Sequence, residues 1–422
     1  MNAWSWRDGL RYGALGAPLA FAALPLYVLL PSHYGAQLGV PLAGLGAVLL
    51  GTRALDALVD PALGRLADRT LARPRRHAMA LALLAGLLMA LGFAALFSPP
   101  AGSSSGLLLA WCGAALVVTC LGYSTLGVLH QAWGARLGGG PQRQAAVVSW
   151  REGLALAGVL AASVLPALAG IPAMVATAIA LLALALWALA GAPYRLAPPR
   201  PAQASAGAAP GDAWLPWRVP DFRRLMAVFL LNGVASAIPA TLVLFFIRDR
   251  LAAPAWEPAF LGAYFAAAAV SMPLWVRAVA RWGLLRCWLA GMGLAVAAFS
   301  GAARLGSGDT TAFAAICLFS GAALGADLAV PGALLAGVIR RAGHALHHEG
   351  RYFGWWTCAN KLNLALAAGL ALPLLQALGY QPGARDASAL TALALIYAAV
   401  PCLLKLLAAA LLWHHRHSLD RP

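Results

Sequence analysis

The sequence is dominated by apolar segments that are long enough to cross a lipid bilayer. An α-helix rises about 1.5 Å per residue, so about 20 residues span the hydrocarbon core. Backbone polar groups inside a bilayer must be hydrogen-bonded within their own segment, which favours helices. Twelve spans are predicted, at residues 12–31, 38–60, 77–97, 105–128, 145–169, 172–192, 224–247, 258–277, 284–303, 310–336, 354–377 and 388–412. We therefore predict an all-α polytopic membrane protein with twelve transmembrane helices.

Composition and loop charge agree with this prediction and give an orientation. Of the 422 residues 62% are hydrophobic and only 10% are charged, which no soluble domain of this length requires. The net charge of +16 is spread over the loops, so we expect no nucleic-acid partner. Arginines gather in alternate loops, and the opposite side holds only Arg248, Arg250, Arg304 and Arg385. The positive-inside rule then predicts a multi-pass protein of the cell (inner) membrane with both termini in the cytoplasm.

A segment rich in Pro, Ala and Gly separates the sixth and seventh spans. Such a composition is typical of a linker. We predict an N-terminal six-helix bundle at residues 1–193, a cytoplasmic linker at 194–222 and a C-terminal six-helix bundle at 223–422. Duplicated bundles with a binding site between them are a common plan of secondary transporters.

The second predicted span carries charged residues before any loop signal appears. Arg53, Asp56 and Asp60 are spaced by three and four residues, which places them on one helical face. Ionisable groups at membrane depth are costly and are usually paired, turned inward and functional. Two acids and an arginine facing inward indicate a cation site; solvated charges at an early helix end are the alternative. A second polar cluster, predicted as a separate loop, follows about two turns later and contains Gly64, Asp68 and Arg69.

Other polar groups fall within predicted spans and could face the same interior. The ionisable ones are Arg151, Glu152, Asp327 and Lys361, and the uncharged ones are Tyr123, Ser124, His130, Gln131, Asn232 and Asn363. With the second-span cluster they give three cations and four anions, which would be nearly neutral if they met. A local ion pair or a protonated acid is the alternative for Glu152 and Asp327. For His130 and Gln131 we favour an ordinary hydrated position near the cytoplasmic end.

Motifs of other protein classes do not occur in the sequence. There is no Walker loop, no nucleophile elbow and no zinc-protease motif. We therefore predict a transporter coupled to an ion gradient, without an organic cofactor, rather than an enzyme. A polytopic membrane enzyme is less favoured because the sequence shows no nucleophile or metal constellation, and a channel is less favoured because it does not predict paired halves. The expected partners are a small-molecule solute, a coupling cation and membrane lipids, and we expect the chain to act as a monomer.

The segment RALDALVDPALGRLADRT resembles the major facilitator superfamily, and specifically the glycoside–pentoside–hexuronide:cation symporters, the melibiose permease-like family. The resemblance implies two six-helix bundles and cation-coupled symport of a sugar or glycoside by alternating access. It places Arg53, Asp56 and Asp60 on the family's cation-site motif. The same resemblance places Gly64, Asp68 and Arg69 on the cytoplasmic gating motif. Arg151 and Lys361 match an arginine of the fifth helix and a lysine of the eleventh.

The sequence departs from this family at several positions. The two sugar-binding acids align with Pro18 and Gly127, so a lipid-like amphiphile or another non-sugar metabolite is an alternative solute. Val59 replaces a polar residue of the cation site, whereas Ser124 keeps a hydroxyl ligand. Hard cations such as Na⁺ prefer several oxygen ligands, whereas H⁺ needs only a carboxylate. The coupling ion is expected to be H⁺ or Na⁺, with H⁺ favoured, and no metal is expected beyond Na⁺ at Asp56 and Asp60.

Overall fold

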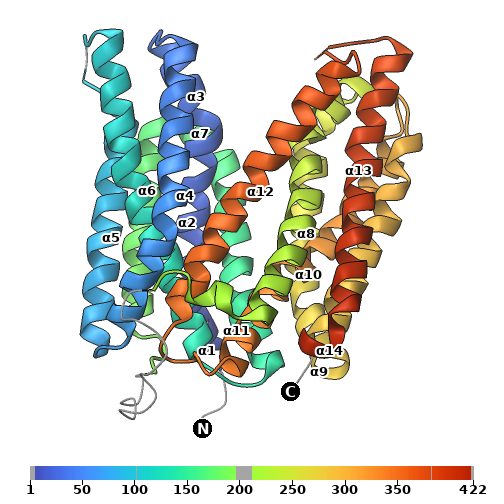
Figure 1. Ribbon diagram of the computed structural model, residues 1–422. Helices are drawn as coiled ribbons and strands as arrows, with labels where there is room; N and C mark the ends of the chain where they lie inside the picture. Colours follow the sequence, from blue (N-terminus) through green and yellow to red (C-terminus); the bar gives the residue numbers. More distant parts are fainter. Residues whose placement is uncertain (1–4, 101, 196–211, 382, 420–422) are drawn as a thin grey trace. The chain divides into compact units, whose positions relative to one another are not determined.

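The computed structural model describes residues 5–100, 102–195, 212–381 and 383–419 (Figure 1). These residues form helices and connecting turns, and no strand occurs among them. The predicted all-α fold is confirmed. Most of the predicted central linker, residues 196–211, lies outside the described residues.

The first predicted span consists of several consecutive helical pieces. Helix α1 (Trp6–Gly13) begins with a capping box, in which the side chains of Ser5 and Asp8 accept each other's backbone N–H. It is followed by α2 (Gly16–Leu24), η1 (Pro25–Leu29), α3 (Leu30–Ser32) and η2 (His33–Gln37). Two of these pieces are π-helical turns, η1 and η2. Proline has no backbone N–H, which is consistent with the change of helix type at Pro25.

Helix α4 (Leu42–Leu71) carries the polar cluster of the second predicted span and also the cluster predicted to follow it. It continues through Pro61, so the prediction of a separate polar loop at Gly64, Asp68 and Arg69 is wrong. The helix packs against α6 (Ser105–Arg136) and α5 (Arg75–Leu96). Its extension is stabilised by packing and polar contacts with another helix, described below, which outweigh the hydrogen bond that Pro61 removes.

Two long helices each contain a pair of predicted spans. In α7 (Pro141–Ala190) the backbone leaves the helical region at Gly170, and in α9 (Glu257–Ser300) it does so at Gly283. Both glycines have φ of 79°, a conformation that costs glycine little and other residues much. The two glycines lie where the sequence predicts the turns after residues 169 and 277.

The remaining helices complete the fold. The longer ones and their extensions are α8 (Pro220–Phe245), η5 (Phe246–Arg250), α10 (Thr310–Ala329), α11 (Pro331–Arg341), α12 (Glu349–Ala377), α13 (Ala387–His414) and α14 (Arg416–Leu419). Three short 3-10 helices, η4 (Leu215–Arg218), η6 (Pro254–Trp256) and η7 (Ala302–Arg304), lie between the long helices. Among the described residues, nine helical segments are long and apolar enough to cross a membrane. These nine segments cover the third to the twelfth predicted spans, because one of them, Pro254–Arg304, contains two.

The helices divide into two compact units that exchange short segments of the chain. The first unit contains Met1–Gly139, Trp150–Pro216 and Ile339–Cys358, and the second contains Gly140–Ser149, Trp217–Val338 and Ala359–Pro422. Helix α12 therefore contributes its first ten residues to the first unit and the rest to the second. The predicted bundle boundary at residues 194–222 stays a prediction.

Candidate functional site

The predicted cation ligands on α4 and α6 lie in contact within the first unit. The hydroxyl of Ser124 donates a 2.6 Å hydrogen bond to Oδ1 of Asp56. Ser124 is 1% exposed and Asp56 is half-buried. The contact forms because α4 and α6 pack side by side, which brings together two residues 68 positions apart. The predicted pairing of acid and hydroxyl is therefore present in the structure, and their role as ion ligands stays a prediction.

The second acid, Asp60, lies one turn further along α4 and is 0% exposed. Helix α12 passes its backbone so closely that a Cβ atom at Gly354 would lie 2.6 Å from the carbonyl oxygen of Asp60. Val59 is half-buried beside it and offers no ligand atom, whereas the side chain of Arg53 is exposed. Asp60 is thus the acid that the fold shields most from solvent.

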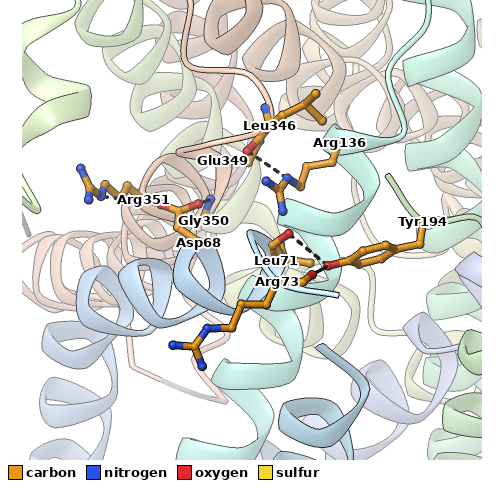
Figure 2. Close-up of polar contacts among 9 residues, drawn as sticks. All are labelled: Asp68, Leu71, Arg73, Arg136, Tyr194, Leu346, Glu349, Gly350 and Arg351. Atoms are coloured by element: carbon orange, nitrogen blue, oxygen red, sulfur yellow. Dashed lines mark hydrogen bonds and ion pairs between the residues drawn. The ribbon is translucent and has the colours of Figure 1, made fainter. Parts of the chain in front are cut away.

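The predicted gate residue Asp68 lies at the first turn of α12 (Figure 2). Its carboxylate accepts hydrogen bonds from the backbone N–H of Gly350 at 2.6 Å and of Arg351 at 3.1 Å. The guanidinium of Arg351 is a further partner, with Nε 3.7 Å from Oδ2. The first N–H groups of a helix have no partner within the helix and carry a positive partial charge, so a carboxylate is stabilised there.

Glycines let α4 and α12 approach closely enough for this contact. A Cβ atom at Gly64 would overlap the carbonyl oxygen of Gly350, and a Cβ at Gly350 would overlap that of Gly64. Arg69, the third residue of the predicted gate, is exposed on α4. The arginine that pairs with Asp68 is instead Arg351. Sequence reasoning missed it because it lies 283 residues away.

Two further contacts lie near the predicted gate residue Asp68 (Figure 2). Glu349 and Arg136, each 2% exposed, form an ion pair with Nε 3.5 Å from Oε2. The hydroxyl of Tyr194 donates to the carbonyl oxygens of Leu71 at 3.0 Å and Arg73 at 2.8 Å, which fastens the end of α4. Partial burial raises the pKa of Tyr194, so the hydroxyl keeps its proton for this role.

The fifth-span charges form a local pair. Arg151 donates to Oε1 of Glu152 from Nε at 2.9 Å and from its terminal nitrogen at 2.7 Å. This agrees with the alternative of a local ion pair for Glu152. In α6, Tyr123 is half-buried, and Gln131 donates to the hydroxyl of Thr357 at 3.4 Å.

The hydrated position expected for His130 is wrong. Its side chain is 1% exposed, and Nε2 lies 2.7 Å from the carbonyl oxygen of Tyr12. The Tyr12 hydroxyl in turn donates to the backbone oxygen of His130 at 2.9 Å. This reciprocal pair gives partners to the Tyr12 hydroxyl and to Nε2 of His130 in the interior, whereas Nδ1 of His130 is buried without one among the described residues.

Another polar cluster, the Asp327 cluster, lies in the second unit around Asp327 of α10. Its Oδ1 accepts from Asn232 at 3.1 Å and from the indole N–H of Trp288 at 2.9 Å. Its Oδ2 accepts from Lys405 at 2.7 Å and from Ser236 at 3.4 Å. Lys405 also donates to Oδ1 of Asn232 at 2.8 Å. The structure thus unites the predicted residues Asn232 and Asp327 with Lys405 and Trp288, which were not predicted.

Lys361 lies half-buried on α12, in the second unit. Its predicted partners Asp56 and Asp60 belong to the first unit, so the predicted counter-ion pair stays a prediction. One signal for Lys405 was present in the sequence: it and Lys361 are the only lysines, and both fall inside predicted spans.

Helices of membrane-spanning length that carry buried acids are typical of polytopic membrane proteins with a functional interior. Residues 10–421 match the profile of the family described as MFS/sugar transport protein, and the chain belongs to this family. The predicted family relationship is thereby confirmed. A curated relative, the inner membrane symporter YicJ of Escherichia coli (strain K12), is 29% identical over 160 residues. That alignment covers 37% of this chain and 33% of YicJ, about one third of the relative's length.

Solved structures share the fold over nearly the whole chain. A bacterial homologue of the iron transporter ferroportin, in an outward-facing state, has a TM-score of 0.71 at 17% identity and covers 98% of this chain and 100% of its own. The fucose:proton symporter FucP of E. coli has a TM-score of 0.65 at 13% identity, with 95% and 98% covered. The human organic anion transporter MFSD10 (TETRAN) has a TM-score of 0.64 at 17% identity, with 96% and 98% covered. These likenesses show the twelve-helix fold of the major facilitator superfamily, whose members here are transporters and not enzymes.

Proposed function

We propose that this protein is a cation-coupled symporter that moves a small solute, such as a sugar or glycoside, by alternating access. The observation that carries the proposal is the hydrogen bond between Ser124 and Asp56, one turn from the fully buried Asp60. Support comes from the partial similarity to an inner membrane symporter and from the fold shared with a fucose:proton symporter. We also propose that the chain resides in the inner membrane with both termini in the cytoplasm.

The coupling ion that fits this site best is H⁺. A proton on either carboxylate removes one negative charge from the pair, and Ser124 can then accept a hydrogen bond instead of donating one. Na⁺ would need several oxygen ligands, and Val59 supplies none at the position between the two acids. Proton binding changes the charge that α4 presents to the interior. If the two conformations bind the proton with different affinities, its binding shifts the equilibrium between them.

The predicted gate at Asp68 would link this change of charge to the opening of the cytoplasmic side. In the proposed cycle Asp68 holds the first turn of α12 while the cytoplasmic side is closed, and the bonds break when that side opens. Because these bonds exist in only one of the two states, they contribute directly to the equilibrium between them. Asp60 and Asp68 lie on the same continuous helix, α4, so ion loading and gate opening would act on one element.

A lipid-like amphiphile or another non-sugar metabolite is the second candidate solute. The resemblance to melibiose permease-like symporters aligns their two sugar-binding acids with Pro18 and Gly127 of this chain. A solute without several hydroxyl groups would not need those acids.

Counterflow in proteoliposomes tests the proposed function. Purified protein is loaded with an unlabelled candidate inside, and uptake of the labelled candidate is followed. Panels of sugars, glycosides, organic acids and lysophospholipids are compared at two external pH values, with and without Na⁺. Uptake that rises as the external pH falls supports proton symport. Transport of no candidate in any gradient contradicts the proposal.

A further inference from the structure

The second unit contains a pocket that belongs to neither the predicted cation site nor the predicted gate. Its lining comes from α8, α9, α10 and α13, all within that unit. Five aromatic side chains form much of its wall: Phe260, Tyr264, Phe265, Phe299 and Tyr397. Its volume is about 160 Å³. An engineered cavity of about 150 Å³ lined by aliphatic and aromatic side chains binds benzene, so this pocket has the size of a one-ring molecule.

A polar group at the pocket wall has hydrogen-bonding capacity to spare. Lys405 lines the pocket, and its ammonium group carries three protons. Two of them are used, by Asn232 at 2.8 Å and by Asp327 at 2.7 Å. The third proton is left for an acceptor atom of a ligand. Asp327 has four donors around its two oxygens, so it serves to hold Lys405 and to balance its charge.

Two tyrosine hydroxyls add to this capacity. Tyr397 is buried, and its ring stacks on Phe246 with centroids 4.2 Å apart. Within the part of the chain that the structure describes, the hydroxyls of Tyr397 and Tyr264 form no hydrogen bond. Both residues line the pocket, and a tyrosine hydroxyl can donate one hydrogen bond and accept another. A ligand with an oxygen atom would supply the missing partner.

We propose that this pocket binds an uncharged, mainly apolar molecule of one-ring size that carries a hydroxyl or carbonyl oxygen. The aromatic wall takes the apolar body, and Lys405 and Tyr397 bind the oxygen. A charged ligand is disfavoured because Asp327 already neutralises Lys405, so an added anion would be buried without a counter-ion. The site lies in the second unit, whereas the proposed cation site lies in the first. It therefore does not depend on the proposed transport cycle.

Fluorine NMR of three probes tests the proposal with the full-length protein in lipid nanodiscs. The probes are 4-fluorobenzyl alcohol, 4-fluorotoluene and 4-fluorobenzoate, and empty nanodiscs give the lipid background. We expect the alcohol to bind about threefold to tenfold more tightly than the toluene, the range of one hydrogen bond. The benzoate should bind more weakly than the alcohol. Equal binding of alcohol and toluene, or tighter binding of the benzoate, would overturn the assignment of the polar end.

A pocket-filling variant tests the location. Ala240 of α8 lines the pocket, so Ala240→Phe should weaken binding of the alcohol at least tenfold while leaving the contacts of Asp327 in place. Ala227→Phe is the matched control, because this alanine is exposed on the same helix and lies outside the pocket. Tyr397→Phe keeps the ring and should reduce binding of the alcohol but not of the toluene. Unchanged binding in Ala240→Phe, in a protein that remains folded by thermal unfolding, would overturn the site.

Discussion

The carboxylate of Asp68 on α4 caps the backbone N–H of Gly350 at the start of α12, although 282 residues separate the two in sequence. The same carboxylate reaches the next N–H, of Arg351, and the Arg351 guanidinium. A charge-assisted hydrogen bond contributes about 1.5–3 kcal/mol. A contact of this strength would be enough to bias the equilibrium between the two states of the proposed transport cycle.

Replacing Asp68 by Asn should open the gate. The amide keeps one acceptor oxygen but turns an N–H₂ donor toward the donors of α12, and it removes the charge. We expect the amides of Gly350 and Arg351 to exchange hydrogen at least about tenfold faster, since that is the effect of about 1.4 kcal/mol. Hydrogen exchange of residues 349–358 in nanodiscs measures this. Turnover in counterflow should fall while solute binding survives.

The control for this variant is Asp221→Asn. Asp221 is also an acid in the first turn of a helix, α8, where it pairs with the exposed Arg224. The Asp221→Asn substitution removes the same charge from a helix terminus without changing a contact of α12. If hydrogen exchange of residues 349–358 were equal in Asp68→Asn and Asp221→Asn, the gating role of Asp68 would be rejected.

Gly64 should tolerate no larger side chain. A methyl group there would overlap the backbone of Gly350, and the neighbouring atoms are main chain, which cannot move aside cheaply. Gly64→Ala should therefore separate α4 from α12. The expected result is a lower midpoint of thermal unfolding in detergent, or faster hydrogen exchange of the backbone amides at the start of α12. Gly51→Ala on the same helix is the matched control, because a Cβ there meets nothing within 4 Å. Alanine is a better helix former than glycine by about 1 kcal/mol, so this control should be neutral or slightly stabilising.

These contacts show what the sequence could and could not predict. Local spacing placed Asp56 and Asp60 on one face, and the apolar segments located the helices, because both depend on residues close in the chain. The segment after Pro61 looked like a loop because its stabilising partners, Gly350 and Arg351, are remote in sequence. The burial of His130 is hidden from the sequence for the same reason, since the partner of its Nε2, the carbonyl oxygen of Tyr12, is 118 residues away.

The cluster around Asp327 shows the same limit in the second unit. Asn232 and Asp327 were singled out as polar residues in apolar segments, but nothing local indicates that Trp288 and Lys405 complete the cluster. Lys405 did carry a signal, as one of two lysines in an arginine-rich chain and inside the last span. Only the packing of α8, α9, α10 and α13 reveals which polar residues meet.

Removing one partner of the Asp327–Lys405 pair should destabilise the protein strongly. Both side chains lie largely inside the second unit, with Nζ 2.7 Å from Oδ2. Lys405→Met would leave the carboxylate buried without its cation, which typically costs about 3–5 kcal/mol. The double variant Lys405→Met with Asp327→Asn should recover much of this loss, because no charge remains unpaired. Thermal unfolding in detergent of the single and double variants measures the coupling; a double variant whose losses simply add would contradict it.

The ion site gives the prediction that separates H⁺ from Na⁺. Asp56→Asn and Asp60→Asn should each abolish uphill accumulation, because neither variant can carry a coupling proton at that position, yet downhill exchange of solute should persist. In the parent protein uptake should rise as external pH falls, since more protons are available to load the site, and Na⁺ should have little effect.

Ser124→Ala is the variant that decides between the two ions. Under proton coupling it keeps both carboxylates and should retain uphill transport with an altered pH profile. Under Na⁺ coupling it loses an oxygen ligand and should weaken Na⁺ stimulation about tenfold or more, the effect of one net ligand interaction. Uptake against pH and Na⁺ in proteoliposomes, with Asp221→Asn as the charge-matched control, distinguishes the two. Full uphill transport in both acid variants would reject the site itself.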